Sequence, residues 1–443
     1  MPKLIRVALW IAAVALLPCE QVFAIAVRSP CDRPFVFPGV DLNVVVLPYS
    51  QPSSLGATTP EVGTQLGQLV EFETLLAIAK FGSVGLIQTV GDPEDECTPE
   101  IVLGKLVGSE MLQPRHALIM IWGRIFESGS DLYLQTYLRF LRRDATENVE
   151  FVEGGRTLSG RLSSQSLALA PRKIALSELE RIQQQYATAN LLRATPNADA
   201  AFVRIPESGG PYSFGITDVR GDWVELAPMS ATQNVLPRGW VLARAPTDGL
   251  SLRERMPELA LVEGIAGYLS ARVRNETRPL AAADAALSEY LERWRRGAFL
   301  AEQDTAASGM TLAVAIPEQL RGIMVLLRAT GSSADSAAAH DHFKRAATLM
   351  PYSASARNLS AISGVSLALR ERQPDRPPRQ YLSDLLAAVN NDPGDREALD
   401  NLAELYDLVL TPPSGAPSRW SVPTADREAL TQERDALRAV LRP

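Results

Sequence analysis

The sequence predicts a multidomain α+β protein: an amino-terminal α/β sheet domain, then a small β-barrel, then a carboxyl-terminal all-α helical repeat domain. Three observations predict this order. β-Branched apolar runs alternate with a helical pattern within residues 30–165. Short apolar segments that contain Trp223 and Trp240 follow within residues 190–246. From residue 257 to 442 alanine and leucine dominate, and apolar residues recur about every 3.6 positions, as they do along a helix.

The composition is that of a globular, water-soluble chain. The 443 residues are 46% hydrophobic and 21% charged. At roughly 100–200 residues per domain, this length indicates several domains. The formal net charge of -7 argues against nucleic acid or an anionic membrane surface as the main partner. Because only 3 histidines and 3 cysteines are present, we expect no cofactor and no dedicated metal site.

Residues 30–165 are predicted to form a layered α/β domain. Residues 42–49 are a β-branched run ended by proline, which is typical of a buried strand. Further strands are expected at 84–90, 116–126 and 132–141, the last two joined as a hairpin, and helices at 61–80 and 98–107. Residues 171–189 carry apolar residues at helical spacing, so we expect a connecting helix there.

The amino terminus has the layout of a secretory signal peptide over residues 1–24. Lys3 and Arg6 come first, an apolar run follows, and the segment ends in small residues at Ala24. We therefore expect cleavage after Ala24 and a periplasmic mature protein with no integral membrane segment. The alternative is an uncleaved anchor, but this run is shorter than the roughly 20 apolar residues that span a bilayer.

Cleavage would leave Cys31 and Cys97 as the cysteines of the mature chain. Two cysteines in an oxidising compartment more often pair than stay free, so we expect a disulfide between them. Closing so long a loop stabilises the fold by about 4 kcal/mol on the chain-entropy model. The alternative is two unrelated buried thiols.

The amino-terminal pattern is similar to a known class of envelope domains. NVVVLPY enters a predicted helix, and ALIMIWGRIFESGSDLYLQTYLRF closes the unit as a hairpin. This order resembles the extracytoplasmic α/β domains of curli-secretion and TolB amino-terminal type. The resemblance implies a role in envelope assembly rather than catalysis.

Residues 190–246 resemble a bacterial SH3 domain. The segments NLLRATP at 190–196, GDWVEL at 221–226 and RGWV at 238–241 match, in order, that family's opening strand and turn, its Gly-Asp-Trp strand and its closing strand. The insert at 227–237 is longer than the usual loop. The resemblance implies a small barrel that binds cell-wall peptides or proline-containing protein segments.

Four aromatic residues are candidates for the ligand groove of that barrel: Tyr212, Phe214, Trp223 and Trp240. Aromatic faces are what polyproline segments and similar extended peptides dock against. The alternative is that the tryptophans only pack in the core.

Residues 257–442 resemble an array of tetratricopeptide repeats. The second half of one repeat is matched by Ala339, Phe343, Ala346 and Pro351. A second copy has Leu385, Ala388 and Pro393, but Tyr381 stands where a small residue is usual. Further helices are expected at 280–294, 317–327 and 426–441. The resemblance implies a groove lined by the first helix of each pair.

Three acidic residues of the last repeat, Glu397, Asp400 and Glu404, share one face of a predicted helix. The family turns this face into the groove, so the resemblance implies an acidic lining that favours a basic or amine-bearing ligand segment. The alternative is a solvated charged face.

No catalytic motif is recognisable. His340 and His342 are two apart on a predicted helix, and neither Gly-x-Ser-x-Gly nor His-Glu-x-x-His occurs. We therefore expect a non-enzymatic exported scaffold of the bacterial cell envelope whose partners are envelope proteins or peptidoglycan stem peptides. The alternative is a cell-wall-modifying hydrolase with its active site in the amino-terminal domain, where Cys31, Cys97 and His116 are the available groups.

The disulfide can be tested by mass measurement. Mature protein alkylated without reduction should carry no label, because Cys31 and Cys97 are expected to be bonded. The same protein reduced first should carry a label on each. Labelling without reduction would show that both thiols are free.

Overall fold

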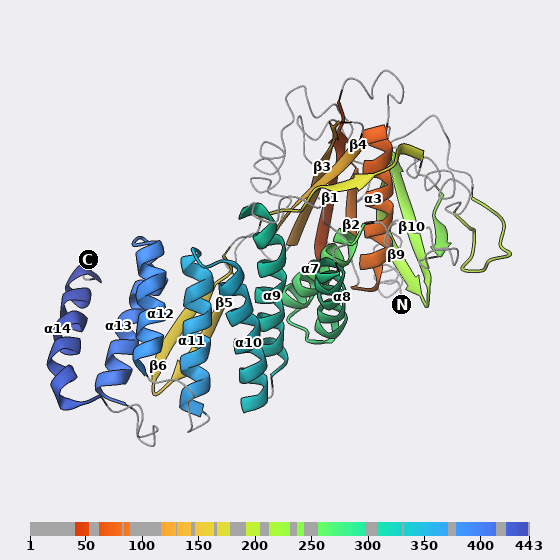
Figure 1. Ribbon diagram of the computed structural model, residues 1–443. Helices are drawn as coiled ribbons and strands as arrows, with labels where there is room; N and C mark the ends of the chain where they lie inside the picture. The colour runs from red at the N-terminus through yellow and green to blue at the C-terminus, as the bar shows by residue number, and fades with distance from the viewer. Residues whose placement is uncertain are drawn as a thin grey trace, which may run out of the picture.

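The computed structural model describes residues 40–52, 62–81, 84–88, 117–129, 131–142, 147–163, 166–177, 192–203, 212–230, 237–242, 256–296, 308–329, 332–370, 378–412 and 422–441. Within them the protein is mixed α+β, with a sheet region toward the amino terminus and a helical region toward the carboxyl terminus (Figure 1). This confirms the coarse fold class predicted from the sequence. The predicted signal peptide, Cys31, Cys97 and His116 lie outside the described residues.

In the described part of the chain, one large sheet has nine strands. They are β1 (Leu42–Ser50), β2 (Val84–Gln88), β3 (Ala117–Ser128), β4 (Asp131–Arg142), β7 (Ser166–Ala168), β8 (Arg172–Ile174), β9 (Tyr212–Arg220), β10 (Trp223–Ser230) and β11 (Gly239–Leu242). The order is β11-β10-β9-β2-β1-β3-β4-β7, and β8 also pairs with β4. β1 is parallel to β2 and β3, whereas β3 and β4 form the predicted antiparallel hairpin.

Strand β1 lies in the middle of the sheet because both its faces are apolar. Val44 and Val45 point to opposite faces, and both are almost completely buried. Near the end of the strand, the ring of Tyr49 lies against Gly123 of β3, where a Cβ atom would come within 2.0 Å of it. A glycine at this position of β3 is therefore required for the tyrosine to be buried.

The separate barrel predicted over residues 190–246 is not confirmed. β9, β10 and β11 pair in series, and β9 also pairs with β2, so these strands extend the large sheet. Arg193 adds isolated bridges to Phe202 and Trp240 beside β11. Among the described strands no closed barrel forms, because the outer edge of β2 takes β9 as its partner.

The connecting helix predicted over residues 171–189 begins differently. Arg172–Ile174 form strand β8, which pairs with β4. Residues 178–191 lie outside the described residues. The apolar spacing over the first positions of this segment therefore reflects the alternation of a strand, with Ile174 buried against the sheet.

Helices α3 (Val62–Ile78) and α7 (Glu258–Arg274) contact each other and the central strands, and the short η2 (Ala79–Phe81) follows α3. Every residue of α7 from Glu258 to Ala271 is buried, because the sheet lies on one side of it and the next helix on the other. A helix that is enclosed in this way links the two regions of the chain.

The buried carboxylates at this junction have cationic or hydroxyl partners. Glu258 of α7 lies 3.4 Å from Arg172 of β8, and Glu263 pairs with Lys80 of η2. On the sheet side, Glu147 accepts a hydrogen bond from Tyr268 of α7 and pairs with Arg142 at 2.7 Å. These contacts fix α7 on the sheet, since a buried charge without a partner is strongly destabilising.

The remaining helices form an array of neighbours that leads away from the sheet (Figure 1). They are α8 (Arg278–Arg295), α9 (Ser308–Arg328), α10 (Ser333–Leu349), α11 (Ala354–Arg370), α12 (Pro378–Asn391), α13 (Arg396–Leu410) and α14 (Thr424–Leu441). The helices predicted at 280–294 and 426–441 coincide with α8 and α14. The helix predicted at 317–327 begins earlier, since Pro317 lies inside α9.

The residues that carry the repeat-like pattern lie between neighbouring helices. Ala339, Phe343 and Ala346 of α10 are fully buried, and the Phe343 ring packs against Gly322 of α9. Tyr381, the departure from the pattern, is also buried. Its ring lies against Gly364 of α11, so a small residue on the partner helix makes room for a large one.

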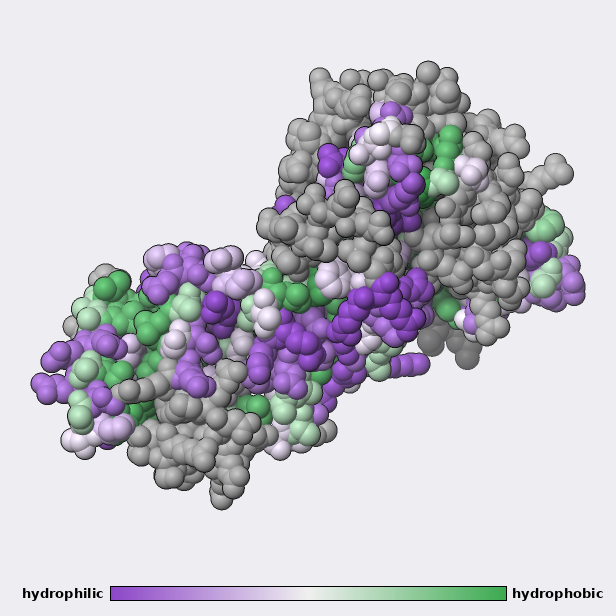
Figure 2. Space-filling model, viewed as in Figure 1, coloured by the Kyte–Doolittle hydropathy of each residue, from purple (hydrophilic) through white to green (hydrophobic). Residues whose placement is uncertain are grey.

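Figure 2 shows hydrophilic residues over the region of α8, where sheet and array meet. Arg295 and Arg296 at the end of α8 are among the most exposed members of ion pairs in this region, with side chains 60% and 74% exposed. Within the described ranges, no helix is long and apolar enough to cross a bilayer.

The close packing of α7 on α8 gives a stability prediction. A Cβ on Gly264 would lie 2.3 Å from Leu287 of α8, so Gly264→Val should destabilise the protein by about 1–3 kcal/mol through over-packing. Ala285→Val on the exposed side of α8 is the control and should cost less than about 1 kcal/mol. Urea unfolding measures both. Equal effects would show that α7 and α8 are not packed closely at this glycine.

Candidate functional site: a strand hairpin held by the helical array

A second, smaller sheet lies against the array. Strands β5 (Asn148–Glu153) and β6 (Arg156–Arg161) form an antiparallel hairpin that leaves the large sheet after β4 and contacts α11 and α13 (Figure 1). Its turn is Gly154 and Gly155, both with positive φ, at 58° and 78°. Two consecutive residues of positive φ make the tight turn whose twist matches antiparallel strands.

One face of the hairpin is anchored by apolar contacts. Val149, Phe151 and Leu158 are buried and belong to the same hydrophobic core as the array helices. Gly160 of β6 allows close approach to α11, because a Cβ at this position would lie 2.7 Å from Leu359. Burying side chains of this size contributes about 1.5–3 kcal/mol each, so the hairpin is a fixed part of the helical region.

The array also holds β6 by its backbone. The Oδ1 atom of Asn401 on α13 accepts a hydrogen bond from the N–H of Ser159 at 2.9 Å, and its Nδ2 donates to the Ser159 carbonyl. Asn358 of α11 donates to the same carbonyl at 3.1 Å and accepts from Asn401 at 2.8 Å. Both asparagines are about 1% exposed. At Ser159, therefore, two buried side-chain amides hydrogen-bond the outward backbone groups of β6 as a neighbouring strand would.

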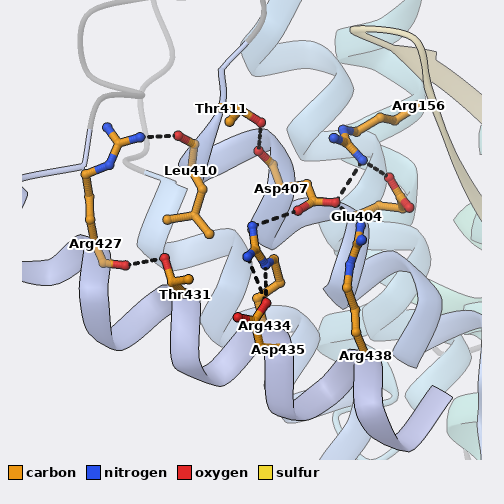
Figure 3. A network of polar contacts seen from close by, with 10 residues as sticks. All are labelled: Arg156, Glu404, Asp407, Leu410, Thr411, Arg427, Thr431, Arg434, Asp435 and Arg438. Atoms are coloured by element: carbon orange, nitrogen blue, oxygen red, sulfur yellow. Dashed lines mark hydrogen bonds and ion pairs between the residues drawn. The ribbon is translucent and has the colours of Figure 1, made fainter. Parts of the chain in front are cut away.

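Charged contacts join the hairpin turn to the last two helices (Figure 3). Arg156 pairs with Glu404 at 2.5 Å and with Asp407 at 3.0 Å, both on α13. Asp407, whose side chain is 8% exposed, also pairs with Arg434 and Arg438 of α14. A single buried carboxylate thus connects three guanidinium groups from two separate elements, which is the arrangement a buried charge needs.

Helix α11 holds the hairpin at both ends, at Glu153 beside the turn and at Arg161 at the open end. Glu153 accepts hydrogen bonds from Ser366 at 2.6 Å and from Arg370 at 2.8 Å. Ser355 donates to the carbonyl of Arg161. Together with the asparagines, these contacts place polar groups of the array along the length of β6 and at the turn-side end of β5.

A cleft of about 960 Å³ lies beside the turn, between β6 and the helices α13 and α14. Its lining includes Gly155, Arg156, Thr157, Asp400, Glu404 and Arg438. The volume lies within the range of about 300–1,000 Å³ that is usual for ligand sites.

The structure brings the three predicted acidic residues to this side of α13. Glu404 pairs with Arg156, and Glu397 lies 4.0 Å from Arg161. Burial raises the pKa of the Glu397 carboxyl above its ordinary value, and the Arg161 guanidinium partly offsets this. Asp400 is exposed at the cleft. Basic side chains of the same chain therefore face two of these acids.

The predicted aromatic residues lie elsewhere, on the strands β9 to β11 at the far end of the molecule from α13 (Figure 1). Trp240 is 5% exposed, and the Arg220 guanidinium stacks on it at 4.9 Å. Trp223 is partly exposed, and Tyr212 begins β9. Trp240 is thus covered, whereas Trp223 keeps an accessible surface beside Leu242, its neighbour across the strands.

Phe202 adds an aromatic side chain that the sequence pattern did not indicate. It is 51% exposed and lies under the Arg193 guanidinium at 4.4 Å. Because Arg193 bridges to both Phe202 and Trp240, these side chains lie on the same face of the sheet as Trp223. An arginine-backed aromatic face is therefore present on the large sheet.

The two described histidines have partners inside the array. The Nδ1 atom of His342 lies 2.6 Å from Glu318 of α9, and that of His340 lies 3.0 Å from Ser363 of α11. Burial alone would raise the pKa of Glu318, but His342 and Arg345 lower it below its ordinary value. These contacts hold α9, α10 and α11 together.

Comparisons with protein-family models, with curated proteins and with solved structures found no match to this chain.

The backbone clamp generates a prediction. Asn401→Ala removes the acceptor of the Ser159 N–H and the donor to the buried Oδ1 of Asn358, and a buried acceptor without a partner costs about 1–3 kcal/mol. Urea unfolding should show that loss, and hydrogen exchange at the Ser159 amide should become faster. Asn391→Ala is the matched control, since exposed Asn391 donates only to the Pro351 carbonyl and its loss should change stability by less than about 0.5 kcal/mol. Unchanged exchange at Ser159 would contradict the clamp.

Proposed function

We propose that this chain is a non-enzymatic, exported adaptor of the bacterial cell envelope that binds extended protein or peptidoglycan-peptide segments. The observation that carries the proposal is the way in which the array holds β6. Asn401 and Asn358 contact the backbone of Ser159, while Arg156 meets the acids of α13.

Backbone contacts of this kind suit the recognition of extended chains. A side-chain amide that hydrogen-bonds both the N–H and the C=O of one residue recognises the extended backbone of that residue, whatever its side chain is. Charged side chains around it then select among sequences. Both kinds of contact are supplied by α11 and α13, from adjacent helix pairs, which supports the proposal that the array acts as a set of repeats.

Two further features support the finer parts of the proposal. Alanines at the helix contacts, Ala339, Ala346 and Ala388, are fully buried, in keeping with tetratricopeptide-like repeats. On the large sheet, strands β9 to β11 and the bridges of Arg193 follow one another as in a small meander, in keeping with an SH3-like unit built onto the sheet. Export to the periplasm rests on the predicted signal peptide.

Binding through the aromatic face can be tested with purified peptidoglycan sacculi. Wild-type protein should sediment with sacculi, and Trp223→Ala should weaken this by about 2 kcal/mol, as for a typical aromatic hot spot. Thermal melting of the same variant separates lost binding from lost folding. Tyr352→Ala is the matched control, since Tyr352 is 87% exposed in the turn before α11, away from the large sheet.

The outcome assigns the binding region. If folded Trp223→Ala protein sediments like wild type, the aromatic face does not bind the wall. If wild-type protein neither sediments with sacculi nor binds extended peptides, the adaptor proposal fails as a whole.

A further inference from the structure

The hairpin is a permanent part of the helical region and not a removable occupant, because Val149, Phe151 and Leu158 anchor it in the common core. What stays open is the cleft of about 960 Å³ at its turn end. This cleft runs along the outer edge of β6, since Thr157 and Ser159 of that strand line it together with Asp400 and Asn401 of α13.

Along the outer edge of β6, both backbone groups of Ser159 and the carbonyl of Arg161 are hydrogen-bonded, and Thr157 is open. Backbone N–H and C=O groups on one side of a strand recur at every second residue. The groups of Ser159 meet Asn401, and the carbonyl of Arg161 meets Ser355. The backbone N–H and C=O of Thr157 point to this same side, into the cleft. No described residue hydrogen-bonds either group. An exposed strand edge of this kind accepts another extended chain.

The charges beside this edge specify the chemistry of that chain. Arg156 and Arg438 already pair with Asp407, and Glu404 pairs with Arg156. Asp400 lies one helical turn before Glu404, is exposed in the cleft, and has no ion-pair partner among the described residues. A lysine or arginine of a ligand would pair with Asp400, as Arg156 pairs with Glu404.

We propose that the cleft binds an extended basic segment of another protein, which adds to β6 at Thr157 and places a lysine or arginine on Asp400. The proposal rests on the proposed adaptor function and names the ligand class of the array. A polypeptide is favoured over a wall fragment because the free edge offers a donor and an acceptor spaced for a β-strand.

The test uses the full chain and a short fluorescein-labelled peptide of alternating threonine and valine with one central lysine. Fluorescence anisotropy should detect binding that weakens as salt is added. The same peptide with a central glutamate should bind about tenfold more weakly, because its charge repels Asp400. Equal binding of the two peptides would overturn the proposal.

Two variants test the two halves of the site. Asp400→Lys should weaken the lysine peptide about tenfold, whereas Glu428→Lys, the same charge change at an exposed position of α14 outside the cleft lining, should leave it unchanged. Thr157→Pro removes the outward N–H without touching the hydrogen bonds to β5, so it should abolish binding at an unchanged melting temperature. Glu150→Pro, on the outer edge of β5, is its control.

Normal peptide binding by folded Asp400→Lys or Thr157→Pro protein would overturn the site. The exposed Asp400 variant keeps the test decisive even if the proline variant unfolds. Wild-type protein that sediments with sacculi but ignores the lysine peptide would refute this inference and leave the adaptor function standing. If wild-type protein neither sediments with sacculi nor binds the lysine peptide, both this inference and the adaptor function are refuted.

Discussion

Helix α7 buries ionisable groups where it meets the sheet, and each of these groups needs a partner from the sheet region. This requirement sets how the sheet region and the helical region are placed. Glu258 needs Arg172, Glu263 needs Lys80, and Tyr268 reaches Glu147. These partners come from separate parts of the sheet region. Because an unpartnered buried charge costs several kcal/mol, the contacts are satisfied together only when α7 lies in one position on the sheet. The start of the helical array is thereby fixed.

The β5–β6 hairpin fixes the array a second time, farther from the sheet. It leaves β4, lies against α11 and α13, and reaches α14 through the shared carboxylate of Asp407. A helical array held only at its first helix would depend on contacts between neighbours alone. Here the hairpin contacts helices of successive pairs, so their spacing and the cleft at the turn are set by the same strand.

This double attachment has a functional consequence. The side of α13 that carries the acidic residues faces strand β6. Asn401 on this side already hydrogen-bonds Ser159, and Glu404 already pairs with Arg156. Binding there uses what the hairpin leaves open, namely the strand edge at Thr157 and the carboxylate of Asp400. The aromatic face near Trp223 lies at the other end of the molecule, so the two proposed binding surfaces are well separated (Figure 1).

The sequence by itself determined many of the element types and the acidic face, since periodicity, turn glycines and helical spacing are local properties. It did not indicate the β5–β6 hairpin, and it predicted a helix where strand β8 lies. It indicated β1, the β3–β4 hairpin, and the helices α8 and α14, and it placed Glu397, Asp400 and Glu404 together. Only the tertiary structure decided what meets that face. Arg156 and Glu404 are 248 positions apart, and no local pattern pairs them. Asn358 and Asn401 resemble ordinary polar helix positions until β6 lies against them, because an amide can satisfy a strand edge only where folding has brought that edge within reach.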